Sequence, residues 1–544
     1  MAPRQRWFVG LLVAALVAVA CAPSPTVRTE RADSFGDVLD DTFTADEPAD
    51  DTAPADDEPP GPSDPGDPDE PDPPGTTVAD PVVVDPDAIN FGDNKPPRDY
   101  DDYLLATAND LEVWLAEEYP SAFGGEWLPL QGEIWAGYPE RTDPIPGCGQ
   151  RETSYEELQL FVAFYCPPGN GGPSGDFIVY DDGNDPIFIP GVGRQEPILS
   201  SLAEQFGPAT IGIVLAHEYG HAIQERTGAL DQNLPTVVTE QQADCVAGAW
   251  AGRAEAGQAT GVPFTDSDTQ AGLIAMITVQ DPIGTNPLAA GGHGSGFDRV
   301  GAFQVGFNEG LARCAQLIEN PLPLVLLDFV GDRETEGNAP FGFEENQLFD
   351  FLPQDLNLLY DNDLEADFPN FEPLTLVPVS SLADATCGDL STGFENGAAL
   401  CDESSTVYLN VPVAQQIYDE FGDFAPGYLL GVAWAEAALL SNGSTLLGEE
   451  RALEADCLTG NWVRTVIPER DANGNLVLDD EGFIVLPQPR DPGRGASVSP
   501  NDLTEAIQIA ILIGDEDDEV NTIGSAFEKI DAFRQGTLFG LDSC

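Results

Sequence analysis

An internal duplication constrains the fold of this chain more than any other feature of its sequence. Three pairs of segments match when the chain is laid against itself, and the first pair aligns without gaps. They keep the same order along the chain, as expected for two copies of one structural unit. The matching pairs are 206–223 with 421–438, 242–250 with 454–462, and 294–314 with 524–544. The sequence therefore predicts two tandem modules that share one fold, called here the first and the second copy.

The cysteines follow the same repeat. Nine is an odd number, but setting aside Cys21 near the N-terminus leaves eight, four in each copy. Four cysteines permit three pairings per copy, so the pairing that respects the repeat is a preference. Each longer bridge would tie the last helix of a copy to its Ala-Asp-Cys helix, and would stabilise by roughly 4 kcal/mol in the chain-entropy model. The favoured pairs are Cys148–Cys166, Cys245–Cys314, Cys387–Cys401 and Cys457–Cys544.

The N-terminus has the pattern of an export signal. Arg4 and Arg6 precede an apolar run over 7–20, which is short for a membrane span. The run ends in Ala-Val-Ala-Cys, which resembles a bacterial lipoprotein box with Cys21 as the lipidated residue. Ordinary signal cleavage, which would leave a free thiol, is the alternative. Residues 1–21 are thus predicted to direct export, either as an outward-facing membrane lipoprotein or as a secreted protein.

Residues 22–98 are rich in Pro, Asp, Glu and Gly, and predict a disordered acidic tether. The whole chain has 95 acidic and 21 basic residues, a formal charge of −74. Such a surface repels nucleic acid and anionic lipid, so neither is expected as a partner beyond the lipid anchor. A salty or extracellular setting explains the charge, with calcium binding or a cationic substrate as the alternative.

Hydrophobic periodicity predicts an α+β fold that is mainly helical. Each module should hold one helix of the active-site type, a small β element and two disulfides. The segments 208–226, 237–253 and 299–314 are expected to be helices, and 177–182 and 407–411 strands. The predicted boundaries are 99–320 for the first module, 321–350 for a linker and 351–544 for the second module.

The segment HEYGH carries the chemistry of the first copy. On a helix His217 and His221 lie one turn apart on one face, where two imidazoles can share a tetrahedral Zn²⁺. Glu218 is then placed to take a proton from water, as a catalytic base. Glu240, near the start of the next helix, is the expected third ligand, and Asp244 would support a ligand histidine. Histidines that merely pack on a helix are the alternative.

A family resemblance rests on the order CG, FYCP, DFIVYDD, LAHEYGHAIQ, EQQADCVAGAW and GHGSGFDRVGAFQVGF. Over about 100–314 this order resembles the bacterial neutral zinc metallopeptidases of the YpfJ type. The resemblance implies a compact, gluzincin-like zincin fold with one zinc ion. It also implies that His217, His221 and Glu240 are the ligands and that Glu218 is the general base.

The third histidine, His293, lies in the HG[ST] segment of that family. There it would either bind the developing oxyanion or cap a helix. The second copy has lost the whole set of reactive side chains and keeps only the supporting aspartate, as Asp456. In the alignment His217 becomes Val432, Glu218 becomes Ala433, His221 becomes Glu436, Glu240 becomes Ala452 and His293 becomes Ile523. The second module is therefore predicted to bind no zinc in this manner.

Two functions follow from these features. The first is an exported zinc-dependent peptidase that hydrolyses a peptide or protein substrate, in which the second module is regulatory, substrate-binding or stabilising. The second is a non-catalytic binding or scaffold lipoprotein of the cell envelope, whose first module holds a structural metal. A water-filled fourth coordination position beside a cleft would favour the peptidase.

Overall fold

A computed structural model gives the fold of the chain. It describes residues 85–149, 162–169, 175–183, 187–189, 193–195, 198–281, 291–325, 338–388, 394–468, 501–515 and 523–544, with single positions between them. The predicted signal at 1–21, its Cys21, and the tether over 22–84 lie outside the described residues.

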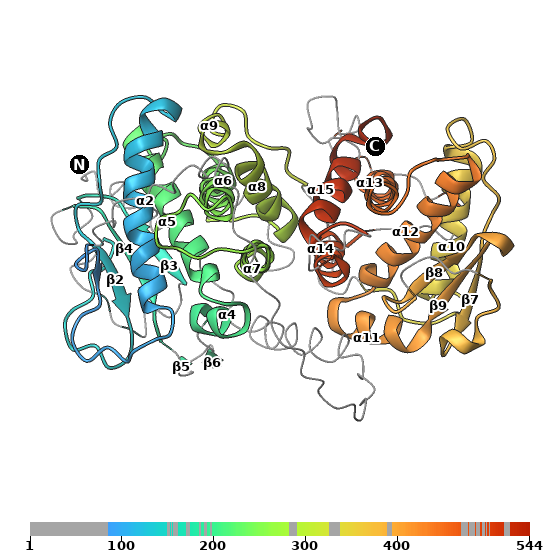
Figure 1. The fold of residues 1–544 in the computed structure, drawn as a ribbon, viewed down its shortest axis with the longest axis horizontal. Coiled ribbons are helices and arrows are strands. Elements are labelled where there is room, and N and C mark those ends of the chain that lie inside the picture. The colour runs from blue at the N-terminus through green and yellow to red at the C-terminus, as the bar shows by residue number, and fades with distance from the viewer. Residues whose placement is uncertain are drawn as a thin grey trace, which may run out of the picture.

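The fold is α+β and mainly helical, as predicted. In the first copy a small sheet lies beside a group of packed helices (Figure 1). The elements of this copy are β1 (Ile89–Asn90), α2 (Asp101–Ala122), β2 (Ile134–Gly137), β3 (Ala163–Cys166), β4 (Phe177–Asp181), β5 (Ile187–Ile189), β6 (Gly193–Gln195), α4 (Ile198–Phe206), α5 (Ala209–Thr227), α6 (Thr236–Glu255), α7 (Asp266–Thr278), α8 (Gly296–Glu309) and α9 (Leu311–Cys314).

The second copy repeats the order of one helix, three strands and then helices, but its described residues hold no counterpart of β1, β5 or β6. In the first copy β4 pairs in parallel with β2 and antiparallel with β3. In the second copy β9 pairs in parallel with β7 and antiparallel with β8. The elements of this copy are α10 (Leu348–Leu358), β7 (Thr375–Val379), β8 (Ala398–Cys401), β9 (Thr406–Asn410), α11 (Val411–Phe421), α12 (Phe424–Ser441), α13 (Glu449–Arg464), α14 (Asp502–Ile513) and α15 (Ala526–Phe539).

The predicted elements agree with the structure except at one helix and at the boundaries. The helix predicted over 299–314 begins at Gly296 and breaks at Gly310, whose φ of 72° ends α8 before the short α9. The linker predicted over 321–350 is wrong at its end, because α10 begins at Leu348 and buries that side chain in the second copy.

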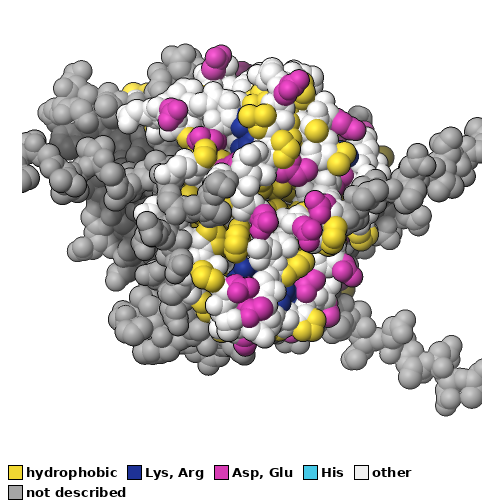
Figure 2. Space-filling model, turned by 90° about the vertical axis from the view of Figure 1, so that its left-hand side faces the viewer, with side chains coloured by type: hydrophobic (Ala, Val, Ile, Leu, Met, Phe, Trp, Pro, Cys, Tyr) yellow, Lys and Arg dark blue, Asp and Glu magenta, His cyan; other side chains and the backbone are white. Residues whose placement is uncertain are grey.

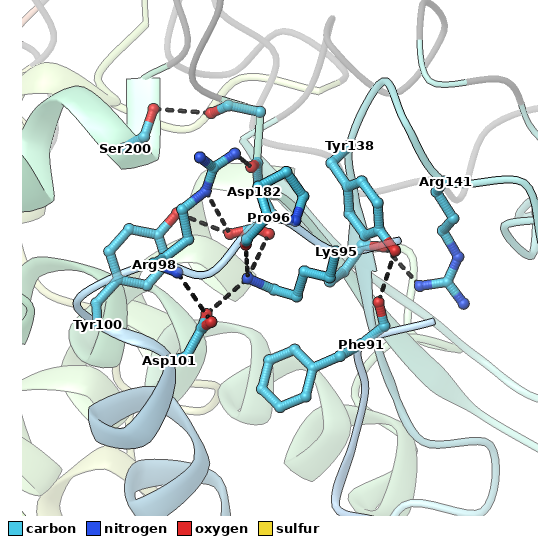
Figure 3. A network of polar contacts seen from close by, with 12 residues as sticks. Phe91, Lys95, Pro96, Arg98, Tyr100, Asp101, Tyr138, Arg141, Asp182 and Ser200 are labelled. Atoms are coloured by element: carbon cyan, nitrogen blue, oxygen red, sulfur yellow. Dashed lines mark hydrogen bonds and ion pairs between the residues drawn. The ribbon is translucent and has the colours of Figure 1, made fainter. Parts of the chain in front are cut away.

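The predicted tether also extends too far, because residues 85–98 are ordered. Ile89 is buried and β1 pairs in parallel with β2. The ammonium of Lys95 lies 2.7 Å from Asp101 and 2.9 Å from Asp182, at the end of β4 (Figure 3). Arg98 donates to the Asp182 carbonyl at 2.7 Å. These contacts hold the start of α2 against the end of β4. The acidic, Pro-rich composition had predicted disorder for residues 85–98, because composition does not show such ion pairs.

The basic side chains are largely used inside the protein. The chain has two lysines, and the other one, Lys529, is 2% exposed and 2.8 Å from Asp456. Arg299 is also buried in an ion pair. One face of the first copy accordingly shows many acidic and few basic side chains (Figure 2). Little positive charge is left at the described surface to offset the acidic residues.

Glycines set the closest helix crossing in both copies. A Cβ on Gly248 of α6 would lie 1.9 Å from the Phe303 carbonyl oxygen of α8. A Cβ on Gly460 of α13 would lie 2.0 Å from the Phe533 carbonyl oxygen of α15. Neither distance leaves room for a side chain, which explains why both glycines were retained in the repeat.

Disulfides lie beside these crossings. Cys245 of α6 is bonded to Cys314, and Cys457 of α13 is bonded to Cys544. The shorter bridges join β3 of the first copy and β8 of the second copy to a preceding loop, as Cys148–Cys166 and Cys387–Cys401. All four pairs are those that the repeat favours.

Of the described helices, α12 alone is long and apolar enough to cross a membrane by length and composition. However, 78% of its apolar window is buried inside the protein. It contacts α10, α13 and α14, so it serves as the central core helix of the second copy.

The buried Asp181 at the end of β4 makes stability depend on pH. Burial raises its pKa to about 7, although Tyr155 and the Gly183 N–H donate to its Oδ1. Between pH 4 and 7 the folded state therefore holds a proton that the unfolded state has released, and stability falls as pH rises. Asp181→Asn is expected to remove this loss and to be more stable than the wild type at pH 8 by roughly 1–3 kcal/mol. Urea unfolding at pH 5 and pH 8 measures the difference, and parallel pH dependences of the two proteins would contradict it.

Candidate metal centre

Two helices bring the predicted ligands together. α5 carries His217 and His221, and ends at Gly228, which has the left-handed conformation (φ 75°) expected of a residue that terminates a helix. α6 carries Glu240 on the facing side. A Cβ on Gly220 would lie 2.5 Å from the Ala243 Cα, so the glycine inside HEYGH permits the two helices to touch at this level.

The ligand atoms of His217, His221 and Glu240 lie within 4.8 Å of one another. The Nε2 atom of His217 is 3.4 Å from one Glu240 carboxylate oxygen, and that of His221 is 3.7 Å from the other. All three side chains are at most 2% exposed. Among the described residues, they are the one group of three or more potential metal-ligand side chains that includes imidazoles.

Both histidines are held through their other ring nitrogen. His217 Nδ1 lies 2.8 Å from Asp244 Oδ1, as predicted. His221 Nδ1 lies 3.0 Å from Gln224 Oε1, and Gln224 Nε2 donates to the Thr239 carbonyl at 2.6 Å. In each ring these contacts leave Nε2 directed at the ligand group. Gln224 was missed in the sequence, although its i+3 spacing from His221 could have indicated it.

Arg299 of α8 completes the support of His217. Its guanidinium donates to both carboxylate oxygens of Asp244, at 2.7 and 3.0 Å, and to the Val279 carbonyl at 2.7 Å. Burial opposes ionisation of Asp244, but Arg299 and His217 hold its pKa below the usual value. The sequence did not predict this role for Arg299, since α8 and α6 are far apart along the chain.

Glu218 lies beside the three proposed ligands and is fully buried. Burial raises its pKa to about 7. The nearby Glu240 carboxylate also raises this pKa, and His217 lowers it in part. A carboxyl group with such a pKa can both take and return a proton near neutral pH. Its position in the helix and its pKa are both suited to a general base.

Several polar atoms of this group have no hydrogen-bond partner of ordinary geometry. They are His221 Nε2 and both carboxylate oxygens of Glu218 and of Glu240. Burial also lowers the pKa of His221 to about 4, so its ring is neutral and can donate a lone pair at pH 7. Leaving such atoms unsatisfied is costly, and a cation between them would remove the cost. Two imidazoles and one carboxylate form a donor set that fits Zn²⁺.

His293 lies close to this group, but its partner is an aspartate outside it. Its Nδ1 is 3.0 Å from Asp281 Oδ1, and its backbone N–H donates to Asp281 Oδ2 at 2.7 Å. The hydroxyl of Ser295 caps α8, so His293 does not have the capping role. Burial opposes ionisation of Glu240, but His221, His293 and His217 hold its pKa well below the usual range. The sequence missed Asp281, which comes 12 residues before His293.

The second copy fills the equivalent position without a metal group. Asp456 accepts hydrogen bonds from Tyr428 at 2.5 Å and from Lys529 at 2.8 Å, where Asp244 meets His217 and Arg299. Glu436, which replaces His221, lies 3.2 Å from Arg451. The carboxylate and its cation are thus retained, while the metal-ligand side chains are replaced.

A second acidic group in the second copy has a different character. Oxygens of Asp423, Asp502 and Glu505 lie within 4.8 Å of one another and are buried. Each carboxylate accepts a backbone N–H, from Ala339, Ser499 and Phe424 respectively. These bonds satisfy loop and helix-end N–H groups near α12 and α14, which is a structural role.

Comparison with known proteins is limited to part of the chain. No family model matches it, and no solved structure does. It is 35% identical over 133 residues to uncharacterized proteins of Mycobacterium tuberculosis and Mycobacterium bovis. The match covers 21% of this chain and 45% of each relative, so the chain spans less than half the length of the curated relatives it matches. These relatives carry no stated activity.

Proposed function

We propose that the first copy is a zinc-dependent peptidase, with His217, His221 and Glu240 as ligands and Glu218 as the general base. The main support is the convergence of three buried metal-ligand side chains next to a buried carboxyl group. The second copy adds support, because it lacks all four residues and keeps their surroundings. Residues required only for folding would be expected in both copies.

Each side chain of the site has a distinct role in the proposed hydrolysis. Zinc held at this site would supply Lewis acidity, which activates water and polarises the scissile carbonyl. Glu218 takes the proton that the attacking water loses and returns it to the leaving amine. Asp244 and Gln224 fix the ligand rings, and His293, oriented by Asp281, donates a hydrogen bond to the developing oxyanion.

The proposal extends to architecture and location. We assign both copies to the zincin-like, gluzincin type of fold, with the metal site lost from the second. The Ala-Val-Ala-Cys sequence and the acidic tether suit a lipoprotein on the outer face of the cell membrane. The acidic surface suits a peptide or protein substrate and disfavours nucleic acid.

Metal analysis of the full chain, paired with digestion of a broad peptide library, tests this function. We expect one zinc ion per chain and cleavage that stops with chelator and returns with added zinc. Zinc-free protein that cleaves equally well would contradict the proposal, as would zinc-loaded protein that cleaves nothing.

The complete burial of the ligands favours one alternative, a structural metal in a binding or scaffold protein. In that case Glu218 would be a fourth ligand, since structural zinc usually has four protein ligands. Zinc binding that depends on Glu218 would support this alternative.

A further inference from the structure

The two copies meet through equivalent helices. α7 and α8 of the first copy pack against α14 and α15 of the second (Figure 1). Gln304 Nε2 donates to the Phe527 carbonyl at 2.8 Å, and Arg534 donates to the Phe297 carbonyl. Gln304 and Arg534 occupy equivalent positions in the repeat, as do Phe297 and Phe527. The interface is therefore close to two-fold symmetric, like that of a homodimer.

One contact across this interface breaks the symmetry. The Thr504 hydroxyl of α14 donates to Gln280 Oε1 at 3.1 Å. Asp515 accepts the N–H groups of Ile523 and Gly524 as Asp281 accepts those of His293 and Gly294, which aligns α14 with α7. In this alignment Gln270 is the first-copy equivalent of Thr504, and it donates instead to the Ile511 carbonyl at 3.1 Å. The second-copy equivalent of Gln280 is Gly514, where a Cβ would lie 2.3 Å from the Ala526 nitrogen. This hydrogen bond thus supports the first copy, and the part of the chain that the structure describes holds no counterpart in the other direction.

Gln280 immediately precedes the aspartate that orients His293. Its Oε1 also accepts the Gly296 N–H at 2.9 Å. Asp281 then accepts from the N–H groups of His293 and Gly294, and its own N–H donates to the Gly294 carbonyl at 3.1 Å. Through these hydrogen bonds, Gln280 and Asp281 hold the segment that carries His293 against the end of α7.

Close packing adds to the hydrogen bond. A Cβ on Gly296 would lie 3.2 Å from Thr504, so α14 rests directly on the start of α8. The Arg534 guanidinium lies 4.5 Å from the Phe297 ring centre. A Cβ on Gly301 would lie 1.6 Å from a nitrogen of the same guanidinium. The second copy therefore packs against the first residues of α8, which directly follow the His293 segment.

We infer that the metal-free second copy positions His293 of the first copy, with Thr504 as the positioning residue that acts through Gln280 and Asp281. This inference rests on the proposed function only for its effect on hydrolysis. It explains why a copy without metal ligands keeps its scaffold, since the scaffold supports the neighbouring site.

The test uses the full chain labelled with ¹⁵N-histidine, because three histidines give a spectrum that His293→Asn assigns. In Thr504→Val the ring signal of His293 is expected to shift or broaden, with and without zinc, while zinc content stays the same. The kcat for peptide hydrolysis should fall about 10-fold with KM little changed, as expected for a misplaced group. Thr504→Ser retains the hydroxyl and should restore both.

Thr459→Val is the matched control. Its hydroxyl is also buried in a helix of the second copy, but donates to the Ala455 carbonyl of the same helix. Gln280→Leu, made in the first copy, should reproduce the His293 shift. A His293 signal that moves no more in Thr504→Val than in Thr459→Val would overturn the inference. A chain with no hydrolysis but a responsive His293 signal would refute the proposed peptidase and support the positioning role.

Discussion

Replacing Glu218 with glutamine is expected to leave one zinc ion in the first copy and to slow peptide hydrolysis by about 10²- to 10⁴-fold. Glutamine has nearly the same shape but cannot take a proton from water. The metal remains because the proposed ligands are on other residues, His217, His221 and Glu240. Zinc content by elemental analysis and kcat/KM on a cleaved library peptide measure the two effects.

Glu225→Gln is the control for this substitution. Glu225 lies on the same helix, and the charged groups that influence its pKa are Asp231, Asp176 and Arg226, none of which is a proposed ligand. Its replacement should leave zinc content and turnover unchanged. Wild-type turnover in Glu218→Gln would rule out the mechanism, and loss of zinc would instead make Glu218 a ligand.

The second large effect is expected at Asp244, which touches both a proposed ligand and a buried cation. Asp244→Asn removes the charge that pairs with Arg299 and orients His217. Zinc affinity should fall about 10- to 100-fold. The free energy of unfolding should fall by roughly 3–5 kcal/mol, because Arg299 stays buried without its counter-charge.

Asp456→Asn separates these two consequences. It also leaves a buried cation, Lys529, without its counter-charge, but in the copy that lacks metal ligands. We expect a loss of stability and no change in zinc affinity. Zinc titrations with a competing chelator, together with urea unfolding of both variants, make the comparison. Equal zinc affinities in the two variants would show that Asp244 contributes to stability and not to zinc binding.

The sequence predicted the features that depend on local period or on comparison of the two copies. Helical spacing placed His217 and His221 on one face, and α5 spans nearly the predicted residues. The repeat led to the four disulfide pairs that the structure contains. Glu240 and Asp244 were found because they follow at a distance that one helix-to-helix connection can span.

Partners distant in the chain could not be predicted in this way. Nothing local shows that Arg299 reaches Asp244, or that Asp281 orients His293. The sequence did contain one signal of the Arg299–Asp244 ion pair. Both copies retain the aspartate, as Asp244 and Asp456, and both have a basic residue at the position of Arg299, which is Lys529 in the second copy. The ordered stretch before α2 was missed because its acidic, Pro-rich composition conceals the ion pairs of Lys95.

Those two lysines offer a practical handle on the protein. Lys95 belongs to the first copy and Lys529 to the second, with side chains 8% and 2% exposed. Amine-directed reagents should therefore find no side-chain amine to modify while both copies are folded. When a copy opens, its single lysine becomes reactive, so peptide mapping after labelling tells which copy opened. The protein carries one internal reporter of unfolding in each half.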